Sequence, residues 1–199
     1  TYTRDFGFQQ RGTVTGKVYR DTNGNGANNS EPNLANITVV LTPPAANGPA
    51  VTVVTDASGN FTASVGLGTV SVDVDQADVD LGAGSVLTTS NDPQNATVTA
   101  GGTVASTAFG FQQRGSVTGH LFNDVNGNGT QDSGEGDLAN ISVVITPANG
   151  SAVTVVTDAN GNYTATAIPA GSVTANVDET DLDLPAGSVI TTANDTQTI

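Results

Sequence analysis

Residues Asp124 to Glu135 have the types and the spacing of a calcium-binding loop. Their sequence, DVNGNGTQDSGE, fits the pattern D-x-[DN]-x-[DN]-G-x5-E without a mismatch. A Ca²⁺ ion takes six to eight oxygen ligands, and such a loop offers side chains at positions 1, 3, 5, 9 and 12 and a carbonyl at position 7. The predicted ligands are Asp124, Asn126, Asn128, the Thr130 carbonyl, Asp132 and Glu135.

The alternative interpretation of this stretch is a solvated turn, because Asn, Gly and Asp favour turns without any ion. Gly129 stands at position 6, where the chain of such a loop must turn sharply. A ligand-type residue at every required position, together with this glycine, favours calcium over the turn.

A shorter version of the loop lies earlier in the chain. Its predicted ligands are Asp21, Asn23, Asn25, the Ala27 carbonyl, Asn29 and Glu31. Asn29 stands where the other loop has Asp132, and Glu31 falls at position 11 because this loop is one residue shorter. The first loop therefore offers two carboxylates, whereas the second offers three. Because affinity follows ligand charge and geometry, we predict a weaker first site.

The segments around the loops have the composition of β-strands. Residues 116–122 before the second loop and residues 140–146 after it are rich in β-branched side chains. A calcium sensor of the EF-hand type needs a helix on each side of its loop. We therefore expect a calcium clip between two strands, and the signalling mechanism of helix-flanked loops does not apply.

Composition excludes several classes of function. The 199 residues carry 19 acidic and 5 basic side chains, a net charge of −14, which opposes binding to nucleic acid or to an anionic membrane surface. No apolar run is long enough for membrane insertion in this fragment, and no signal-peptide pattern is seen, so we expect any export signal or anchor to have been removed or to lie outside these residues. Cysteine is absent, so metal ions are a plausible substitute for disulfides in an extracellular setting. We find no nucleophile motif and no catalytic metal triad around the single histidine, His120, and we predict that the chain is not an enzyme.

The sequence repeats itself at a distance of about one small domain. The segment GFQQRG at residues 7–12 returns at 110–115, and DTNGNG at 21–26 returns as DVNGNG at 124–129. Copies of this length can each bury a core of their own. Short strands alternate with turn signals in both copies, which predicts an all-β fold of two tandem β-sandwich domains.

The expected core follows from alternation along these strands. The predicted inward-facing rows are Val14, Gly16 and Val18; Ile37, Val39 and Leu41; Val70, Val72 and Val74; and, in the second copy, Val117, Gly119 and Leu121; Ile141, Val143 and Ile145; Val173, Ala175 and Val177. Residues 56–60 and 158–162 are expected to form hairpin turns that lead into Phe61 and Tyr163.

The two ends of the chain are shifted relative to the repeat. Residues 12–113 form the first predicted domain, and residues 114–199 form a second one that lacks its own closing strand. Residues 1–11 match the closing strand of a preceding copy, either from a longer array or donated to a neighbouring subunit, and both remain open. The paired phenylalanines Phe6/Phe8 and Phe109/Phe111 are expected in a sandwich core.

Two acidic clusters recur in the copies. They are Asp73, Asp75, Asp78 and Asp80, then Asp178, Glu179, Asp181 and Asp183. Their spacing matches no defined metal loop. A solvated acidic edge that discourages aggregation is favoured over further calcium ligands.

These motifs together resemble the B-type repeat of serine-aspartate repeat surface proteins (the SdrD B-like family), which is related to the B-type domains of collagen adhesins. The carrying elements are Gly-x-Val-x-Gly, the Asp-x-Asn-x-Asn-Gly loop, the Thr-Asp-Ala-x-Gly-Asn turn and the closing Phe-Gly-Phe. The resemblance covers nearly the whole chain as two copies. It implies two Greek-key, immunoglobulin-like (Cna B-like) sandwiches that bind Ca²⁺ through EF-hand-like loops.

The resulting functional prediction is a calcium-stabilised structural repeat of a bacterial extracellular or cell-surface fibre, stalk or adhesin. Its expected partners are neighbouring copies of the same chain or repeat, arranged head to tail, with filament assembly by donation of the N-terminal strand as one option. The alternative is an adhesin module that binds a host or matrix protein or glycan directly. An exposed aromatic or arginine cluster would favour that alternative, and the sequence has no Trp and few Tyr.

Overall fold

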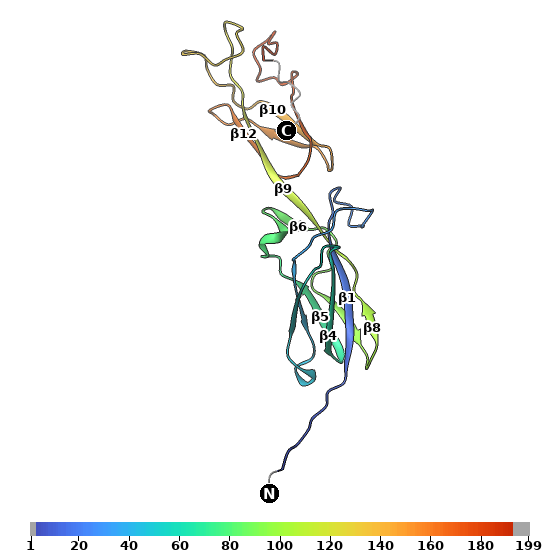
Figure 1. The fold of residues 1–199 in the computed structure, drawn as a ribbon. Coiled ribbons are helices and arrows are strands. Elements are labelled where there is room, and N and C mark those ends of the chain that lie inside the picture. The colour runs from blue at the N-terminus through green and yellow to red at the C-terminus, as the bar shows by residue number, and fades with distance from the viewer. Residues whose placement is uncertain (1–2, 193–199) are drawn as a thin grey trace. The chain divides into compact units, whose positions relative to one another are not determined.

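The computed structural model describes residues 3–192, and their regular structure is almost entirely β (Figure 1). The chain divides into two compact units, unit 1 (Thr1–Gln113) and unit 2 (Arg114–Ile199). Among the described residues helical structure is limited to two short 3-10 turns, η1 (Ala45–Asn47) and η2 (Val79–Leu81). The strands form three sheets, which agrees with the all-β class that the sequence predicts.

In unit 1, the first sheet is built around β1 (Arg11–Arg20). β4 (Asn60–Gly66) pairs with β1 in antiparallel fashion. On the other edge of β1 lie β8 (Thr103–Ala105) and then the start of β9 (Phe109–His120), both parallel to it. We call residues 103–113 the closing strand, because they complete this edge.

The closing strand has a second partner. β6 (Ser85–Leu87) pairs in antiparallel fashion with residues 111–113 of β9. Residues 109–113 therefore lie in a slot between β1 and β6.

The second sheet of unit 1 has the order β3-β2-β5-β7 and is antiparallel throughout. Its strands are β2 (Thr38–Thr42), β3 (Val51–Val54), β5 (Gly68–Val74) and β7 (Gln94–Val98). Side chains from both sheets share one core. Its members include Val14, Val18, Ile37, Val39, Leu41, Val70, Val72 and Val74, all at most 2% exposed. The aliphatic positions of the inward rows predicted for the first copy are confirmed, and Gly16 is half-buried.

Phe109 and Phe111 are 0% and 1% exposed in this core, as predicted. Phe6 and Phe8 are 82% and 98% exposed in this single chain, so they are not part of its own core. Residues 3–10 have no strand assignment and lead away from β1 without a strand beside them (Figure 1). Without a paired neighbour, alternation along a segment has no core to face.

In unit 2, residues 114–120 of β9 pair with β12 (Asn162–Pro169). A three-stranded sheet, β11-β10-β13, consists of β10 (Ser142–Pro147), β11 (Val153–Val156) and β13 (Val173–Val177). The buried residues of this unit include Val117, Ile141, Val143, Ile145, Ala165, Ile168 and Val173. Leu121, Ala175 and Val177 of the predicted rows are half-buried.

The expected hairpins at residues 56–60 and 158–162 are corners instead. Asp56 Oδ1 accepts hydrogen bonds from the amides of Ser58 and Asn60, which forms the expected tight turn. However, β3 pairs with β2 and β4 pairs with β1, so this turn carries the chain from one sheet to the other. The turn at Asp158 likewise joins β11 to β12 in a different sheet. Local turn chemistry does not determine which strands pair afterwards.

Both units seat an aromatic ring on a glycine of their first strand. Gly16 is paired with Phe61, and Gly119 with Tyr163. A Cβ at either glycine would overlap that ring. Glycine leaves room for the aromatic ring of the neighbouring strand, which explains why it interrupts a row of larger apolar residues.

Candidate metal-binding loops

Asp124 organises the second loop through backbone hydrogen bonds. Its Oδ1 accepts from the amides of Gly127 at 2.8 Å and Asn128 at 3.2 Å. Its Oδ2 accepts from the amide of Gly129 at 2.7 Å. Gly129 has a φ of 77°, in the left-handed region that glycine adopts without strain. The loop therefore coils around the first predicted ligand.

The side-chain amides of this loop are held in turn. Asn126 Oδ1 accepts from the amide of Asn128, and Asn128 Oδ1 accepts from the amide and hydroxyl of Thr130. Their Nδ2 groups both donate to Asp132 Oδ2 at 2.7 Å. The third, fifth and ninth positions of the loop are thereby brought together.

Glu135 ties the end of the second loop to its beginning. Oε1 accepts from the amides of Val125 at 2.9 Å and Asn126 at 3.3 Å, and Oε2 accepts from the amide of Asp132 at 2.9 Å. The loop that the sequence pattern predicts is therefore a closed coil, flanked by β9 and β10.

The first loop begins with a fully buried carboxylate. Asp21 is 0% exposed, and it accepts hydrogen bonds from the amides of Asn25 (Oδ1, 3.2 Å) and Gly26 (Oδ2, 2.8 Å). Asn25 also bonds to Asn23, and Asn25 Oδ1 accepts from the amide of Ala27. This arrangement repeats the coil around Asp124.

Glu31 reaches the beginning of its loop although one residue is missing. Oε1 accepts from the amides of Thr22 at 2.8 Å and Asn23 at 3.3 Å, which correspond to the partners of Glu135. Ser30 has a φ of 68°, and this left-handed turn directly before Glu31 accompanies the shorter path. Glu31 Oε2 is buried and has no hydrogen-bond partner among the described residues.

Most predicted ligands are exposed. Asp21 is buried, and Glu31, Asp124 and Glu135 are half-buried, whereas the other predicted ligands of both loops are exposed. Among these, Asp132 accepts from the side-chain amides of the two asparagines. Within residues 3–192, no three His, Cys, Asp or Glu side chains are grouped closely enough to hold a metal ion. The carboxylates of the described residues therefore do not by themselves form a metal cluster.

Electrostatics agrees with this hydrogen bonding. The pKa of Asp124 is lowered, chiefly by a hydrogen bond from the side chain of Thr191 and also by the amides of the loop. The pKa of Tyr19 is raised, first by burial and then by the negative charges of Asp21 and Glu31. Both carboxylates of the first loop therefore act on the same buried hydroxyl. Thr22 and Thr191 were missed by sequence reasoning, because a threonine outside the ligand positions carries no motif signal.

The recurring acidic clusters close turns. Asp78 Oδ2 accepts from the amide of Thr38 at 2.8 Å and Oδ1 from that of Asp80 at 2.9 Å. Asp181 Oδ2 likewise accepts from the amide of Ser142 at 2.8 Å. The pKa of both aspartates is lowered by hydrogen bonding; the largest contribution comes from the side chain of Thr38 for Asp78 and from the amide of Asp183 for Asp181. Each cluster thus ties a turn to the first strand after the loop.

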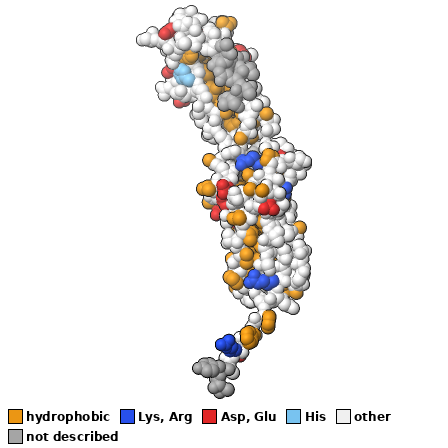
Figure 2. Space-filling model, in the orientation of Figure 1, with side chains coloured by type: hydrophobic (Ala, Val, Ile, Leu, Met, Phe, Trp, Pro, Cys, Tyr) orange, Lys and Arg blue, Asp and Glu red, His pale blue; other side chains and the backbone are white. Residues whose placement is uncertain are grey.

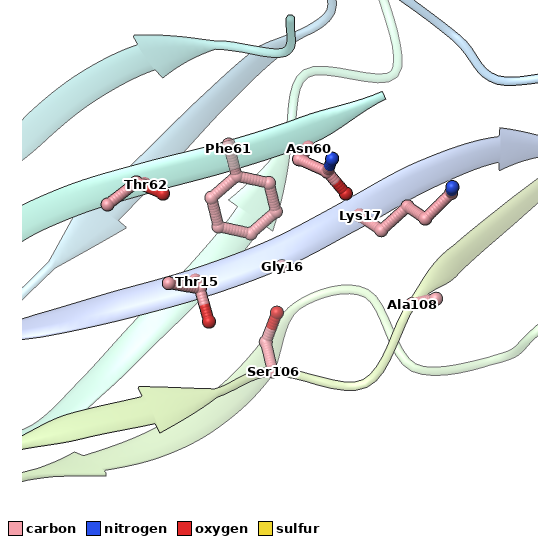
Figure 3. A pocket seen from close by; sticks show the side chains of 8 residues that line it. All are labelled: Thr15, Gly16, Lys17, Asn60, Phe61, Thr62, Ser106 and Ala108. Atoms are coloured by element: carbon pink, nitrogen blue, oxygen red, sulfur yellow. The ribbon is translucent and has the colours of Figure 1, made fainter. Parts of the chain in front are cut away.

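A surface pocket of about 370 Å³ lies in unit 1 beside the closing strand (Figure 3). Gly16, Lys17 and Phe61 line it from β1 and β4, and Ser106 and Ala108 line it from the closing strand. Ser106 Oγ is buried without a partner among the described residues. The pocket lies beside residues 106–108, which connect the end of β8 to the start of β9.

The fold and these loops define an all-β protein with acidic, coiled loops between strands. Residues 115–198 match the model of the SdrD B-like domain, which agrees with the resemblance seen in the second copy. The match covers unit 2 and leaves unit 1 outside it. No curated protein compared with the sequence is a significant match.

Solved structures match the chain at low similarity. The Bacillus anthracis TIE protein is 18% identical with a TM-score of 0.47, covering 96% of this chain and 31% of its own. The streptococcal ancillary pilin is 16% identical with a TM-score of 0.42, covering 96% and 59%. BcpA, the major pilin subunit of Bacillus cereus, is 11% identical with a TM-score of 0.35, covering 96% and 95%. The match thus spans about a third of the length of the TIE protein and about three fifths of that of the ancillary pilin. No helix in the described part of the chain has the length and apolarity to cross a membrane.

Proposed function

We propose that the chain is a calcium-stabilised structural module of a bacterial extracellular or cell-surface fibre, stalk or adhesin, built as two tandem Greek-key sandwiches. The family match over residues 115–198 supports the module type. The observation that supports a metal ion is the buried Oε2 of Glu31. This oxygen has no hydrogen-bond partner among the described residues, and its loop coils around the buried Asp21.

The first loop fits an oxygen-ligated cation. A buried carboxylate is costly unless it is paired or bound to a metal. Oε1 of Glu31 is satisfied by Thr22 and Asn23, whereas Oε2 is not. The residues that would hold Ca²⁺ are Asp21, Asn23, Asn25, the Ala27 carbonyl, Asn29 and Glu31.

The second loop offers the larger number of charged oxygens. The residues that would hold Ca²⁺ are Asp124, Asn126, Asn128, the Thr130 carbonyl, Asp132 and Glu135. Every one of the loop's polar side chains at these positions is already directed by a backbone amide or a neighbouring side chain. Such outer hydrogen bonds orient ligands before an ion arrives.

A bound Ca²⁺ supplies positive charge that offsets the repulsion between carboxylates. The chain itself supplies the closed coil that links the strand before each loop to the strand after it. Because an ion that binds the folded form raises the free energy of unfolding, stability and protease resistance should rise with calcium. The partners of such a module are neighbouring copies, head to tail, joined through the N-terminal segment.

The test is thermal unfolding of the full chain in EDTA and in millimolar Ca²⁺, with Mg²⁺ at the same concentration as the control. We expect a clear rise in Tm with Ca²⁺ that Mg²⁺ does not match. An unchanged Tm in calcium would overturn the proposal.

A further inference from the structure

We propose that residues 3–10 of one chain form the closing strand of unit 2 in a second copy of the same chain. The inference deepens the head-to-tail partnership within the proposed function, and it names the acceptor groove and its register. It rests on three observations: how unit 1 uses its closing strand, what unit 2 exposes at the same positions, and the sequence of the N-terminal segment.

Unit 1 provides the template. Its closing strand pairs with β1 on one side, where Phe109 is aligned with Val18, and with β6 on the other, where Phe111 is aligned with Leu87. The carbonyl of Gly110 accepts from the amide of Thr88 at 2.8 Å. The side chain of Asn91 holds the carbonyl of Ala108 in the same way at 3.1 Å.

The corresponding positions of unit 2 are open. Residues 188–192 repeat residues 85–89 as SVITT and SVLTT, yet 188–190 form no strand, whereas 85–87 form β6. Within the described part of unit 2, residues 114–120 of β9 pair with β12 alone. The slot between β1 and β6 therefore has a counterpart in unit 2 whose two edges carry no described strand.

Side chains around this counterpart are less buried than in unit 1. Leu81 and Tyr19 are each 1% exposed, while their equivalents Leu184 and Phe122 are half-buried. The equivalents of Val18 and Leu87 are Leu121, which is half-buried, and Ile190, which is 40% exposed. Apolar side chains of unit 2 are thus partly accessible at the positions where unit 1 packs Phe109 and Phe111.

The N-terminal segment has the sequence that fits these positions. Residues 3–11, TRDFGFQQR, repeat residues 106–114, STAFGFQQR. In unit 1 the two phenylalanines of this motif are buried, whereas Phe6 and Phe8 are 82% and 98% exposed. Figure 2 shows hydrophobic side chains exposed along this segment. Burial of two such rings is favourable and offsets part of the cost of association.

The repeat also determines the individual contacts. Gly110 lies against the ring of Tyr19, so Gly7 of the donor would lie against Phe122. A side chain at either glycine would overlap that ring, which explains a glycine between two phenylalanines. Ser106 and Ala108 flank the pocket beside Lys17 (Figure 3), and by the same register Thr3 and Asp5 would flank His120.

Connectivity favours a second copy as the donor. In unit 1 the closing strand continues without interruption, as β9, into the first strand of unit 2. Residues 3–10 continue in the same way into β1. A donated segment would therefore reproduce the strand β9 at every junction, and a head-to-tail contact of this kind generates an open filament.

The first experiment compares the full chain with Phe8→Asp in calcium, by sedimentation velocity and negative-stain microscopy. We expect concentration-dependent multimers for the parent chain and a monomer for Phe8→Asp. Val79→Asp is the matched control, because Val79 is 88% exposed in unit 1 and lies outside the motif. A monomeric parent chain, or multimers that persist in Phe8→Asp, would overturn the inference.

The second experiment tests the register, and it uses the absence of cysteine from the chain. Gln112 is aligned with Val86 in unit 1, so Gln9 should be aligned with Val189 of the acceptor. Gln9→Cys with Val189→Cys should give a ladder of disulfide-linked multimers on a non-reducing gel. Gln10→Cys with Val189→Cys should not, because successive strand residues face opposite sides. Equal crosslinking of both pairs would contradict the register.

These outcomes are separate from the calcium test. A chain whose Tm rises with Ca²⁺ but which stays monomeric would refute the donated strand and leave the calcium module intact. Multimers that form although Tm does not change with Ca²⁺ would support the donated strand and refute the calcium module.

Discussion

Glu31 closes the first loop onto Thr22, whose amide and hydroxyl donate to Glu31 Oε1 at 2.8 and 2.9 Å. In the second loop, Glu135 Oε1 accepts from the amide of Val125 at 2.9 Å. The last acidic residue therefore binds the same part of the loop in both units, although one loop is a residue shorter. Carboxylate count, more than loop length, then distinguishes the two proposed calcium sites.

The two sites should differ in affinity for Ca²⁺. We expect calorimetric titration to give two classes of site, the tighter one in the second loop, which has three carboxylates against two. Glu135→Gln should remove the tighter class, with a loss of about tenfold or more in affinity, and Glu31→Gln the weaker class. Glu179→Gln, an exposed position outside the loop, is the control and should change neither. Equal affinities, or a tighter first loop, would contradict this order.

Asp78 should contribute stability that depends on pH. Its pKa is lowered in the folded chain, so its contribution is complete above the ordinary value of 3.8 and is lost as the pH falls through the lowered value. Asp78→Asn should reduce stability at neutral pH and weaken its decline in acid. Denaturant unfolding at several pH values measures both effects. The exposed Asp80→Asn should keep the parent's acid dependence.

Gly16 should not tolerate a methyl group. A Cβ there would overlap the ring of Phe61 and Ser106 Oγ, so Gly16→Ala should destabilise unit 1 by about 1–3 kcal/mol. Gly115→Ala is the matched control, since a Cβ at this β9 position meets no atom within 4 Å. It should be neutral or slightly stabilising in urea unfolding. Similar losses in the two variants would show that ring packing is not the cause.

The hydroxyl of Thr55 should contribute to the stability of unit 1. It is 2% exposed, and its Oγ1 accepts from the amide of Ile37 at 3.0 Å and donates to the carbonyl of Leu34 at 2.7 Å. Thr55→Val leaves both backbone groups without that partner and should cost about 1–3 kcal/mol for a buried group left unsatisfied. Thr52→Val, at an exposed position of β3, should cost little. Chemical denaturation of both variants provides the comparison, and equal stabilities would contradict the role of the hydroxyl.

Much of the fold could be predicted because its signals are local. Alternation along residues 37–41 and 70–74 predicted side chains that prove to be buried, and Phe109 and Phe111 lie in the core as expected. The turn at Asp56 was also foreseen, since its side chain bonds to amides two and four residues ahead. Where the chain goes after that turn could not be foreseen, because sheet membership depends on partners distant in sequence.

For the candidate site, the sequence by itself predicted the coiled loops and their glycine positions, because such a coil follows from the local spacing of Asp, Asn and Gly residues. Only the tertiary structure decided that Glu31 reaches Thr22, that its Oε2 is buried and that Asp78 is tied to Thr38. The tertiary structure also shows that two copies of the same Phe-Gly-Phe motif differ in burial, with Phe111 buried and Phe8 exposed. The physical reason is that burial belongs to a segment together with its neighbours, and the same six residues form a core strand only where two strand edges and an apolar groove receive them.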